Sequence, residues 1–150
     1  MHRLIILENV KHAIYLNATQ ILTPTIIVDK QTKEAKFIVG GAGGTKITTG
    51  ILQVILNTFF FKYSAGDAVA RQRLHHQLSP NELRWQDGVD GIDGPAWAEM
   101  MHNLRDNRGH ELDDGTGMDD VPVIHAIYKH ADGTIEAASD PRHSGVPDGF

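Results

Sequence analysis

The run of small residues from Gly40 to Gly44 is the part of this sequence best suited to chemistry. It follows an apolar, β-branched stretch and precedes a run in which apolar residues recur every three or four positions. It therefore joins a predicted strand to a predicted helix. Glycines at such a junction let several backbone N–H groups point toward one bound atom. The positive end of the helix dipole strengthens their attraction for negative charge. A group bound at this loop should carry or acquire negative charge.

Three kinds of anion site use such a loop, and the spacing excludes two of them. A Walker phosphate loop needs Gly-Lys-Ser/Thr, whereas Lys46 stands between Thr45 and Ile47. A dinucleotide fingerprint anchored at Gly41 needs a glycine where Lys46 stands, and it lacks the strand–helix–strand context. An oxyanion hole, which stabilises the charge formed when a carbonyl is attacked, fits the loop. A tight turn that only lets the helix pack close to the strand stays open as the alternative.

Length and composition place the chain among single-domain globular proteins. Its 150 residues are 41% hydrophobic and 22% charged, with 15 Gly and 6 Pro, which excludes collagen-like and disordered classes. The net charge of −5 has the wrong sign for a nucleic-acid partner. The absence of Cys excludes disulfides, a cysteine nucleophile and thiolate metal sites. The early apolar run Leu4 to Leu7 is too short for a signal or membrane segment, so we expect neither.

The elements around the loop are predicted from periodicity. Thr25 to Val28 and Ala35 to Val39 should form a hairpin, and both faces of its sheet should be covered because neither strand alternates strictly. A long, largely buried helix should begin at Thr45 and extend to Phe60. The segment from Met1 to Leu22 has a loosely helical spacing without a cap, which leaves its structure open.

Later segments continue a pattern of strands, then helices, then strands, which indicates an α+β protein. A helix after Pro95 should bury a stripe of apolar side chains and end at Gly109. The stripe consists of Trp97, Met100, Met101 and Leu104. The remaining elements are a short helix Asp67 to Arg73, an extended segment Leu74 to Leu78, and a hairpin of Val121 to Tyr128 and Thr134 to Ser139 that turns at Asp132-Gly133.

The nine histidines do not predict a metal site. His75 and His76 are neighbours, and His125 and His130 differ by five, so on extended chain each pair points to opposite faces. A zinc site needs three or four convergent ligands. We therefore predict no metal and no cofactor. We expect His125, on an apolar strand, to be a buried, hydrogen-bonded residue and not a catalytic base.

Four blocks of residues carry a further signal. They are Thr23-Pro24-Thr25, Gly40-Gly41-Ala42-Gly43-Gly44-Thr45-Lys46-Ile47-Thr48-Thr49, Arg73-Leu74-His75-His76-Gln77-Leu78, and Ala137-Ala138-Ser139-Asp140-Pro141-Arg142 with Gly145, Pro147 and Phe150. In type and order they resemble the gamma-glutamyl transpeptidase family, also called glutathione hydrolase. The resemblance covers roughly Pro24 to Phe150.

The resemblance implies part of an N-terminal nucleophile hydrolase αββα sandwich. Residues 1–22 would lie outside the family segment, and residues 23–150 would be the C-terminal part of the small subunit. It implies cleavage of a gamma-glutamyl bond through a threonine acyl-enzyme. Glutathione and gamma-glutamyl compounds would be the substrates, and the large subunit of the same precursor the partner. Gly43 and Gly44 would bind substrate and supply the oxyanion-hole N–H groups. The resemblance suggests the extracellular face of the plasma membrane or secretion, whereas the chain itself leaves its compartment open.

The departures from the family pattern concern catalysis. The family's nucleophilic threonine lies upstream of the matched blocks, where Met1 to Asn17 contains no Thr. Gln20 and Ile21 stand where the family has paired serines, and Gln72 replaces a proline. We expect a truncated chain that is inactive by itself. The alternative is a catalytically dead remnant that acts as a binding or interaction module. In either case the upstream strands of the small subunit and the large subunit are missing. Apolar faces of the sheets should then be uncovered, so that the chain expressed alone self-associates.

Overall fold

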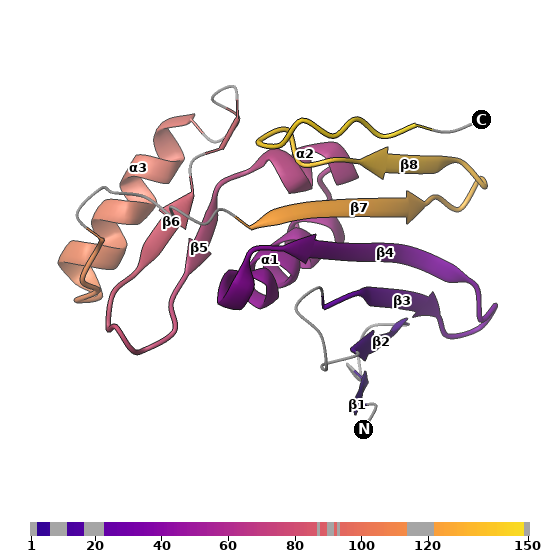
Figure 1. The fold of residues 1–150 in the computed structure, drawn as a ribbon, viewed down its shortest axis with the longest axis horizontal. Helices are drawn as coiled ribbons and strands as arrows, with labels where there is room; N and C mark the ends of the chain where they lie inside the picture. The colour runs from indigo at the N-terminus through magenta and orange to yellow at the C-terminus, as the bar shows by residue number, and fades with distance from the viewer. Residues whose placement is uncertain are drawn as a thin grey trace.

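The computed structural model of the chain describes residues 3–6, 12–16, 23–86, 88–89, 92, 94–113 and 122–148. A six-stranded antiparallel sheet in the order β1-β2-β3-β4-β7-β8 packs against two helices on one face, and a two-stranded sheet and a third helix lie beside it (Figure 1). In chain order the elements are β1 (Arg3–Ile6), β2 (His12–Leu16), β3 (Thr25–Asp29), β4 (Ala35–Ala42), η1 (Gly44–Lys46), α1 (Ile47–Phe59), α2 (Ala65–Ala70), β5 (Arg73–His75), β6 (Arg84–Gln86), α3 (Gly94–His102), η2 (Asn103–Asn107), β7 (Val123–Lys129) and β8 (Ile135–Ala138).

Both predicted hairpins and a helix after the glycine loop are confirmed, but the expectation that this helix is largely buried is wrong, since Leu52 of α1 is 54% exposed. β3 pairs with β4 in a register that sets Thr25 opposite Val39, and a bulge follows Ile27. β7 pairs with β8 across the expected turn, where Gly133 has φ 90°. β4 then pairs with β7, which joins the two hairpins into one sheet. The mixed helices and antiparallel strands confirm the α+β class.

The N-terminal segment contains strands, so its loosely helical spacing did not indicate its structure. β2 pairs with β3, with Leu16 opposite Thr25, and β1 pairs with β2. The backbone of β3 thereby gains hydrogen bonds along an edge that would otherwise be open, which outweighs a weak helical pattern. The two strands extend the sheet sideways and do not form a layer over its face (Figure 1).

The core lies between the sheet and the helices α1 and α2. Phe37 of β4 is fully buried and meets the ring of Phe59 edge to face at a centroid distance of 5.4 Å. The predicted helix tolerates Gly50 because it packs closely on β7. A Cβ added there would lie 3.3 Å from Cδ1 of Ile124. The apolar core consists of Ile27, Phe37, Val39, Ile47, Ile51, Val54, Ala65, Ala68, Val69, Ile124, Ala126 and Ala138.

The other face of the sheet carries exposed apolar side chains, so the expectation that both faces are covered is wrong for this chain. Ile38 lies opposite Ile26 on β3 and opposite Ile127 on β7, which makes a continuous cross-strand row. These three side chains are 40%, 40% and 43% exposed in the order Ile38, Ile26, Ile127. Burial alternates along the strands because α1 and α2 cover only one side. We call this set the open sheet face.

The elements outside the main sheet differ most from prediction. α2 begins at Ala65 after a Ser64 cap, and Arg73 belongs to β5, so the short helix lies earlier than expected. β6 was not predicted at all. The stripe proposed for α3 is not buried, since only Met101 among its residues is inside and Met100 is 38% exposed. A helix at the margin of the molecule has little to pack against (Figure 1). Gly109 does have the expected positive φ, 70°.

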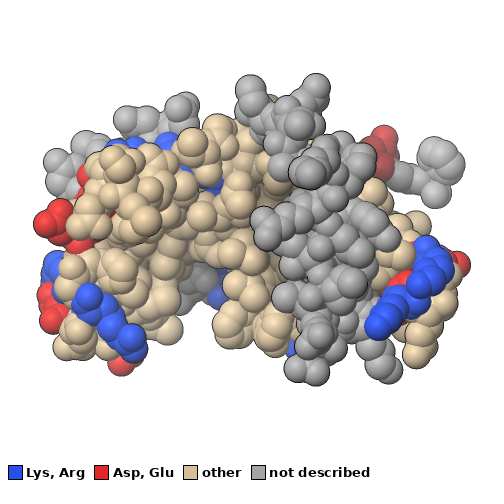
Figure 2. Space-filling view, turned by 90° about the horizontal axis from the view of Figure 1, so that it is seen from below, with Lys and Arg blue, Asp and Glu red and all other residues tan. Residues whose placement is uncertain are grey.

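Charged side chains on the face viewed in Figure 2 gather at the two ends of the molecule, with acidic and basic groups side by side. The described surface between these ends shows few charges. Within the described ranges, no helix has the length and apolarity needed to cross a membrane.

Candidate functional site

The glycine loop lies where β4 passes into the helical layer. β4 ends at Ala42, Gly43 follows, and the 3-10 turn η1 leads directly into α1. Gly43 and Gly44 have φ angles of 131° and 61°, which L residues with a side chain rarely adopt. The sequence places glycine at both positions, so the turn forms without strain.

The two glycines face different surroundings. A Cβ on Gly43 would lie 2.6 Å from Cα of Pro122, which leaves no room for a side chain. A Cβ on Gly44 would meet nothing within 4 Å, and this residue is exposed. Gly43 therefore permits the loop to pass against the start of the β7 segment, whereas Gly44 borders open space. A tight turn accounts for the glycine at position 43. It does not account for the open space beside Gly44.

The N–H groups of Gly43 and Gly44 have no acceptor among the described residues. The Gly44 carbonyl accepts from Ile47 N–H and so belongs to the helical turn, whereas the N–H groups precede it. Two consecutive free donors ahead of a 13-residue helix are suited to a negatively charged oxygen. The structure thus keeps the donors that the oxyanion interpretation requires.

A chain of side-chain hydrogen bonds holds the residues that follow the loop. Gln77 Nε2 donates to the Ser79 carbonyl at 3.0 Å, so Gln77 Oε1 is the acceptor. It receives the Thr45 hydroxyl and His75 Nε2, each at 3.0 Å. His75 therefore carries a proton on Nε2, and its Nδ1 lies 2.9 Å from the Thr49 hydroxyl. We call Thr45, Thr49, His75 and Gln77 the loop clamp.

Gln53 strengthens the same connection one turn further along α1. Its Nε2 donates to the carbonyls of Thr49 at 2.8 Å and Leu74 at 2.7 Å, and its Oε1 accepts Leu74 N–H at 2.7 Å. The β5 backbone is thus fixed to α1 beside the glycine loop. Sequence reasoning missed this group. The polar Thr, His and Gln residues inside two of the family-like blocks could have indicated it. Hydrophobic periodicity gives no information about such polar residues.

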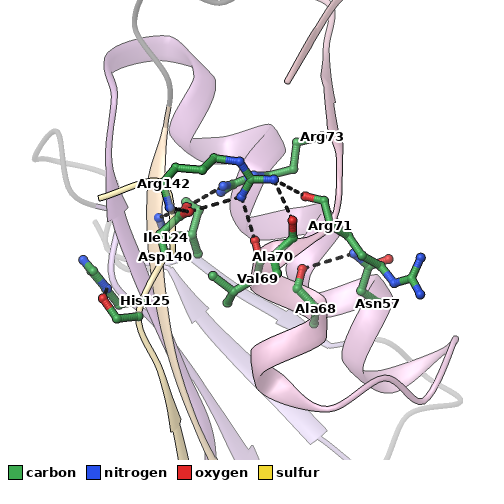
Figure 3. A network of polar contacts seen from close by, with 11 residues as sticks. Asn57, Ala68, Val69, Ala70, Arg71, Arg73, Ile124, His125, Asp140 and Arg142 are labelled. Carbon is green, nitrogen blue, oxygen red and sulfur yellow. Dashed lines mark hydrogen bonds and ion pairs between the residues drawn. The ribbon is translucent and has the colours of Figure 1, made fainter. Parts of the chain in front are cut away.

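A second polar cluster holds the C-terminal block against α2 (Figure 3). Asp140 is fully buried and accepts from Arg73 Nη2 on one oxygen, which also takes Ile124 N–H at 3.1 Å. Its other oxygen accepts from the backbone N–H and Nη1 of Arg142, both at 3.1 Å. Arg142 also donates to three carbonyls at the end of α2: Val69 at 3.1 Å, Ala70 at 2.7 Å and Arg71 at 2.8 Å.

This cluster shifts the ionisation of its members. Burial alone would raise the pKa of Asp140, but the positive charge and hydrogen bond of Arg73, with two backbone N–H donors, lower it overall. Burial lowers the pKa of Arg73, an effect that Asp140 opposes. The cluster is a buried ion pair with two arginines around one carboxylate, and it positions the chain end without touching the glycine loop.

His125 and His76 make none of the hydrogen bonds of the loop clamp. His125 is exposed on the open sheet face, with Nδ1 3.1 Å from the Ser139 hydroxyl, so the expectation that it is buried is wrong. It alternates with Ile124 and Ala126, which take the inward positions of β7. His75 is buried in the loop clamp, whereas His76 lies against the ring of His110. The two neighbours contact different partners, as their spacing predicted.

An antiparallel sheet with helices on one face and a glycine loop leading into the helical layer is half of the αββα sandwich of N-terminal nucleophile hydrolases. The family model described as Gamma-glutamyltranspeptidase matches residues 18–150. The chain belongs to the gamma-glutamyltranspeptidase family, as its four sequence blocks indicated.

Curated relatives agree with this assignment. The chain is 34% identical over 128 residues to a glutathione hydrolase proenzyme of Pseudomonas aeruginosa, an alignment that covers 83% of this chain and 21% of the relative. It is 30% identical over 150 residues to glutathione hydrolase 3 of Arabidopsis thaliana, covering 84% of this chain and 23% of the relative. The chain therefore spans little more than a fifth of the length of these relatives.

Solved structures give the same fold. A gamma-glutamyltranspeptidase from Pseudomonas nitroreducens, complexed with L-DON, superposes with a TM-score of 0.66 at 30% identity, covering 89% of this chain and 64% of that one. A mutant of the Helicobacter pylori gamma-glutamyltranspeptidase superposes with a TM-score of 0.65 at 26% identity, covering 85% and 66%. These neighbours confirm the fold that the resemblance implied.

Proposed function

We propose that this chain supplies the oxyanion hole of an enzyme that cleaves gamma-glutamyl bonds. The observation that carries the proposal is the pair of free N–H groups at Gly43 and Gly44, where the loop leaves space at Gly44. When a threonine hydroxyl attacks the gamma-glutamyl carbonyl, the carbonyl oxygen becomes negative, and the two donors stabilise it. Expulsion of the amine leaves the acyl group on the threonine, and water or an acceptor amine then takes it from there.

The substrates and the partner follow from the family. We propose glutathione and other gamma-glutamyl compounds as donors, with the nucleophile supplied by sequence upstream of the matched blocks. The partner would be the large subunit of the same precursor, seated on the open sheet face, whose exposed row of Ile26, Ile38 and Ile127 suits an apolar layer. We also propose residues 23–150 as the C-terminal part of the small subunit and residues 1–22 as a separate N-terminal segment, of which the family model matches residues 18–22.

The alternative function is a non-catalytic interaction module. One relative, named putative inactive glutathione hydrolase 4 of Arabidopsis thaliana, is 36% identical over 66 residues, covering 44% of this chain. The open sheet face would then serve a binding partner and the glycine loop would have no chemical role. The two functions differ in one respect that can be tested. Only the enzyme requires the N–H groups of Gly43 and Gly44 for activity.

The test removes one backbone N–H without adding a side chain. In the longest protein product that contains these 150 residues, Gly44 is replaced by glycolic acid, whose ester bond lacks the donor but keeps the freedom of glycine. Release of p-nitroaniline from a gamma-glutamyl anilide should fall about 10²- to 10³-fold in kcat. Proline is a poor probe at Gly43, because its ring fixes φ near −65° whereas Gly43 has φ 131°.

The matched control places the same ester at Gly109, whose N–H donates to the Arg105 carbonyl at 3.2 Å in a distant turn. This variant should keep full turnover. An active protein whose kcat survives the ester at Gly44 would contradict the oxyanion role. No turnover from the longest product would favour the interaction module instead. Residues 1–150 alone should release no more p-nitroaniline than buffer.

A further inference from the structure

A cavity lies beside the C-terminal half of α1, whereas the glycine loop precedes the N-terminus of the same helix. Its volume is about 320 Å³, and its walls come from α1, the residues that follow α1, β5 and α3. A ligand in this cavity would bind independently of gamma-glutamyl chemistry.

Aromatic and aliphatic side chains form most of the cavity lining. Phe61, Tyr63 and Trp97 contribute three rings from two separate parts of the chain. Phe61 is 64% exposed and Met100 is 38% exposed, although both border the cavity. Large apolar side chains that surround a concavity and remain in contact with water are typical of a ligand site. The cavity is therefore suited to a flat apolar group such as an aromatic ring.

Arg71 is the only charged side chain among the described residues that line this cavity. Its guanidinium carbon lies 3.6 Å from the centroid of the Tyr63 ring, and Figure 3 shows the guanidinium turned away from Asp140 and Arg142. Stacking uses the face of a guanidinium, whereas the N–H groups that bind a carboxylate lie in its plane. Stacking on Tyr63 thus holds Arg71 in one orientation and is compatible with a bound carboxylate.

We propose that this cavity binds a small aromatic carboxylate. The ring of the ligand lies among Phe61, Tyr63 and Trp97, and its carboxylate pairs with Arg71. No acidic side chain lines the cavity within the described part of the chain, so the lining attracts an anion and repels a cation. The volume of about 320 Å³ is near the lower limit of small-molecule sites, about 300 Å³, which favours a ligand with one ring.

The test uses phenylbutyrate as the probe and the longest protein product that contains these residues. Saturation-transfer difference NMR of the ligand protons measures the Kd. Two further ligands separate the two contributions, since phenylbutanol keeps the ring without the charge and acetate keeps the carboxylate without the ring. Phenylbutyrate should bind at least about tenfold more tightly than either. Equal Kd values for phenylbutyrate and phenylbutanol, or no binding of phenylbutyrate, would overturn the proposal.

Two variants locate the bound probe. Arg71→Gln should weaken the binding of phenylbutyrate about ten- to a hundredfold and leave the weaker affinity for phenylbutanol nearly unchanged. Ala96→Phe, which adds a ring at the cavity wall on α3, should abolish the binding of both. Arg108→Gln is the matched control, because it removes an exposed cation after η2 that does not line the cavity, and the affinity should persist. Unchanged binding of phenylbutyrate to Ala96→Phe would place the ligand elsewhere and refute the proposal, even if Arg71→Gln fails to fold.

Discussion

The imidazole Nδ1 of His75 lies 2.9 Å from the hydroxyl of Thr49, which joins the small sheet to the first turn of α1. Through Gln77 the same ring is linked to Thr45, the residue directly after Gly44. The block that contains His75 is therefore hydrogen-bonded to the residues after the glycine loop, although the two are far apart in the sequence. It holds the helix start that presents the free N–H groups.

His75→Leu should loosen this connection. It removes one of two hydrogen-bond partners from the Thr49 hydroxyl and one of two from Gln77 Oε1, so the free energy of unfolding should fall by about 1 kcal/mol. Amide hydrogen exchange at Thr45 and Lys46, measured by NMR, should become faster. His76→Leu is the adjacent control and should leave both quantities nearly unchanged. Equal effects of the two variants would show that the clamp does not order the loop.

Alanine at the two loop glycines should have unequal effects. Gly44→Ala adds a methyl group in open space and costs only the strain of a left-handed residue, about 1 to 2 kcal/mol. Gly43→Ala adds strain and a clash with Pro122, and should cost about 3 kcal/mol or more. Urea unfolding of both variants checks the order. A larger loss for Gly44→Ala would contradict the described loop.

Asp140→Asn should strongly destabilise the chain, by about 3 to 5 kcal/mol, because it leaves the buried Arg73 without its carboxylate. The lowered pKa of Asp140 also predicts a pH dependence. The folded state holds the proton less tightly than the unfolded state, so the stabilisation is present above the ordinary Asp pKa of about 3.9. It is lost as the pH falls below that value.

Circular dichroism during acid titration measures this effect. The variant should lose less stability than the unmodified chain as the pH falls below about 4. Asp132→Asn, in the exposed β7–β8 turn, serves as the control and should leave stability at neutral pH little changed. If Asp140→Asn is as stable as Asp132→Asn at pH 7, the ion pair does not anchor the C-terminal block.

Ile38→Lys should reduce self-association of the chain expressed alone. Ile38 occupies the centre of the exposed row on the open sheet face, so a charge there makes burial against another copy unfavourable. Light scattering of the unmodified chain should show oligomers, and the variant should shift toward the monomer. Leu52→Lys, on the helical layer, is the control and should not. A monodisperse unmodified monomer that binds no hydrophobic dye would refute the expectation.

The sequence by itself determined the local units of this protein. A strand that runs into Gly40–Gly44 and then a helix could be predicted because hydrophobic period and glycine content are local properties. The two hairpins followed for the same reason. The blocks of residues that resemble the family were sufficient to identify it, and they included Gly43 and Gly44, whose positive φ angles only glycine readily adopts.

Only the tertiary structure decided how these units meet. The Thr45 bond to Gln77 joins residues 32 positions apart, and Arg73 meets Asp140 across 67 positions. No periodicity encodes such pairs. The strands before residue 17 form because the edge of β3 offers hydrogen bonds, and His125 is exposed because the helices cover the opposite face. Burial and pairing depend on what lies across the sheet, and a local pattern contains no information about that neighbour.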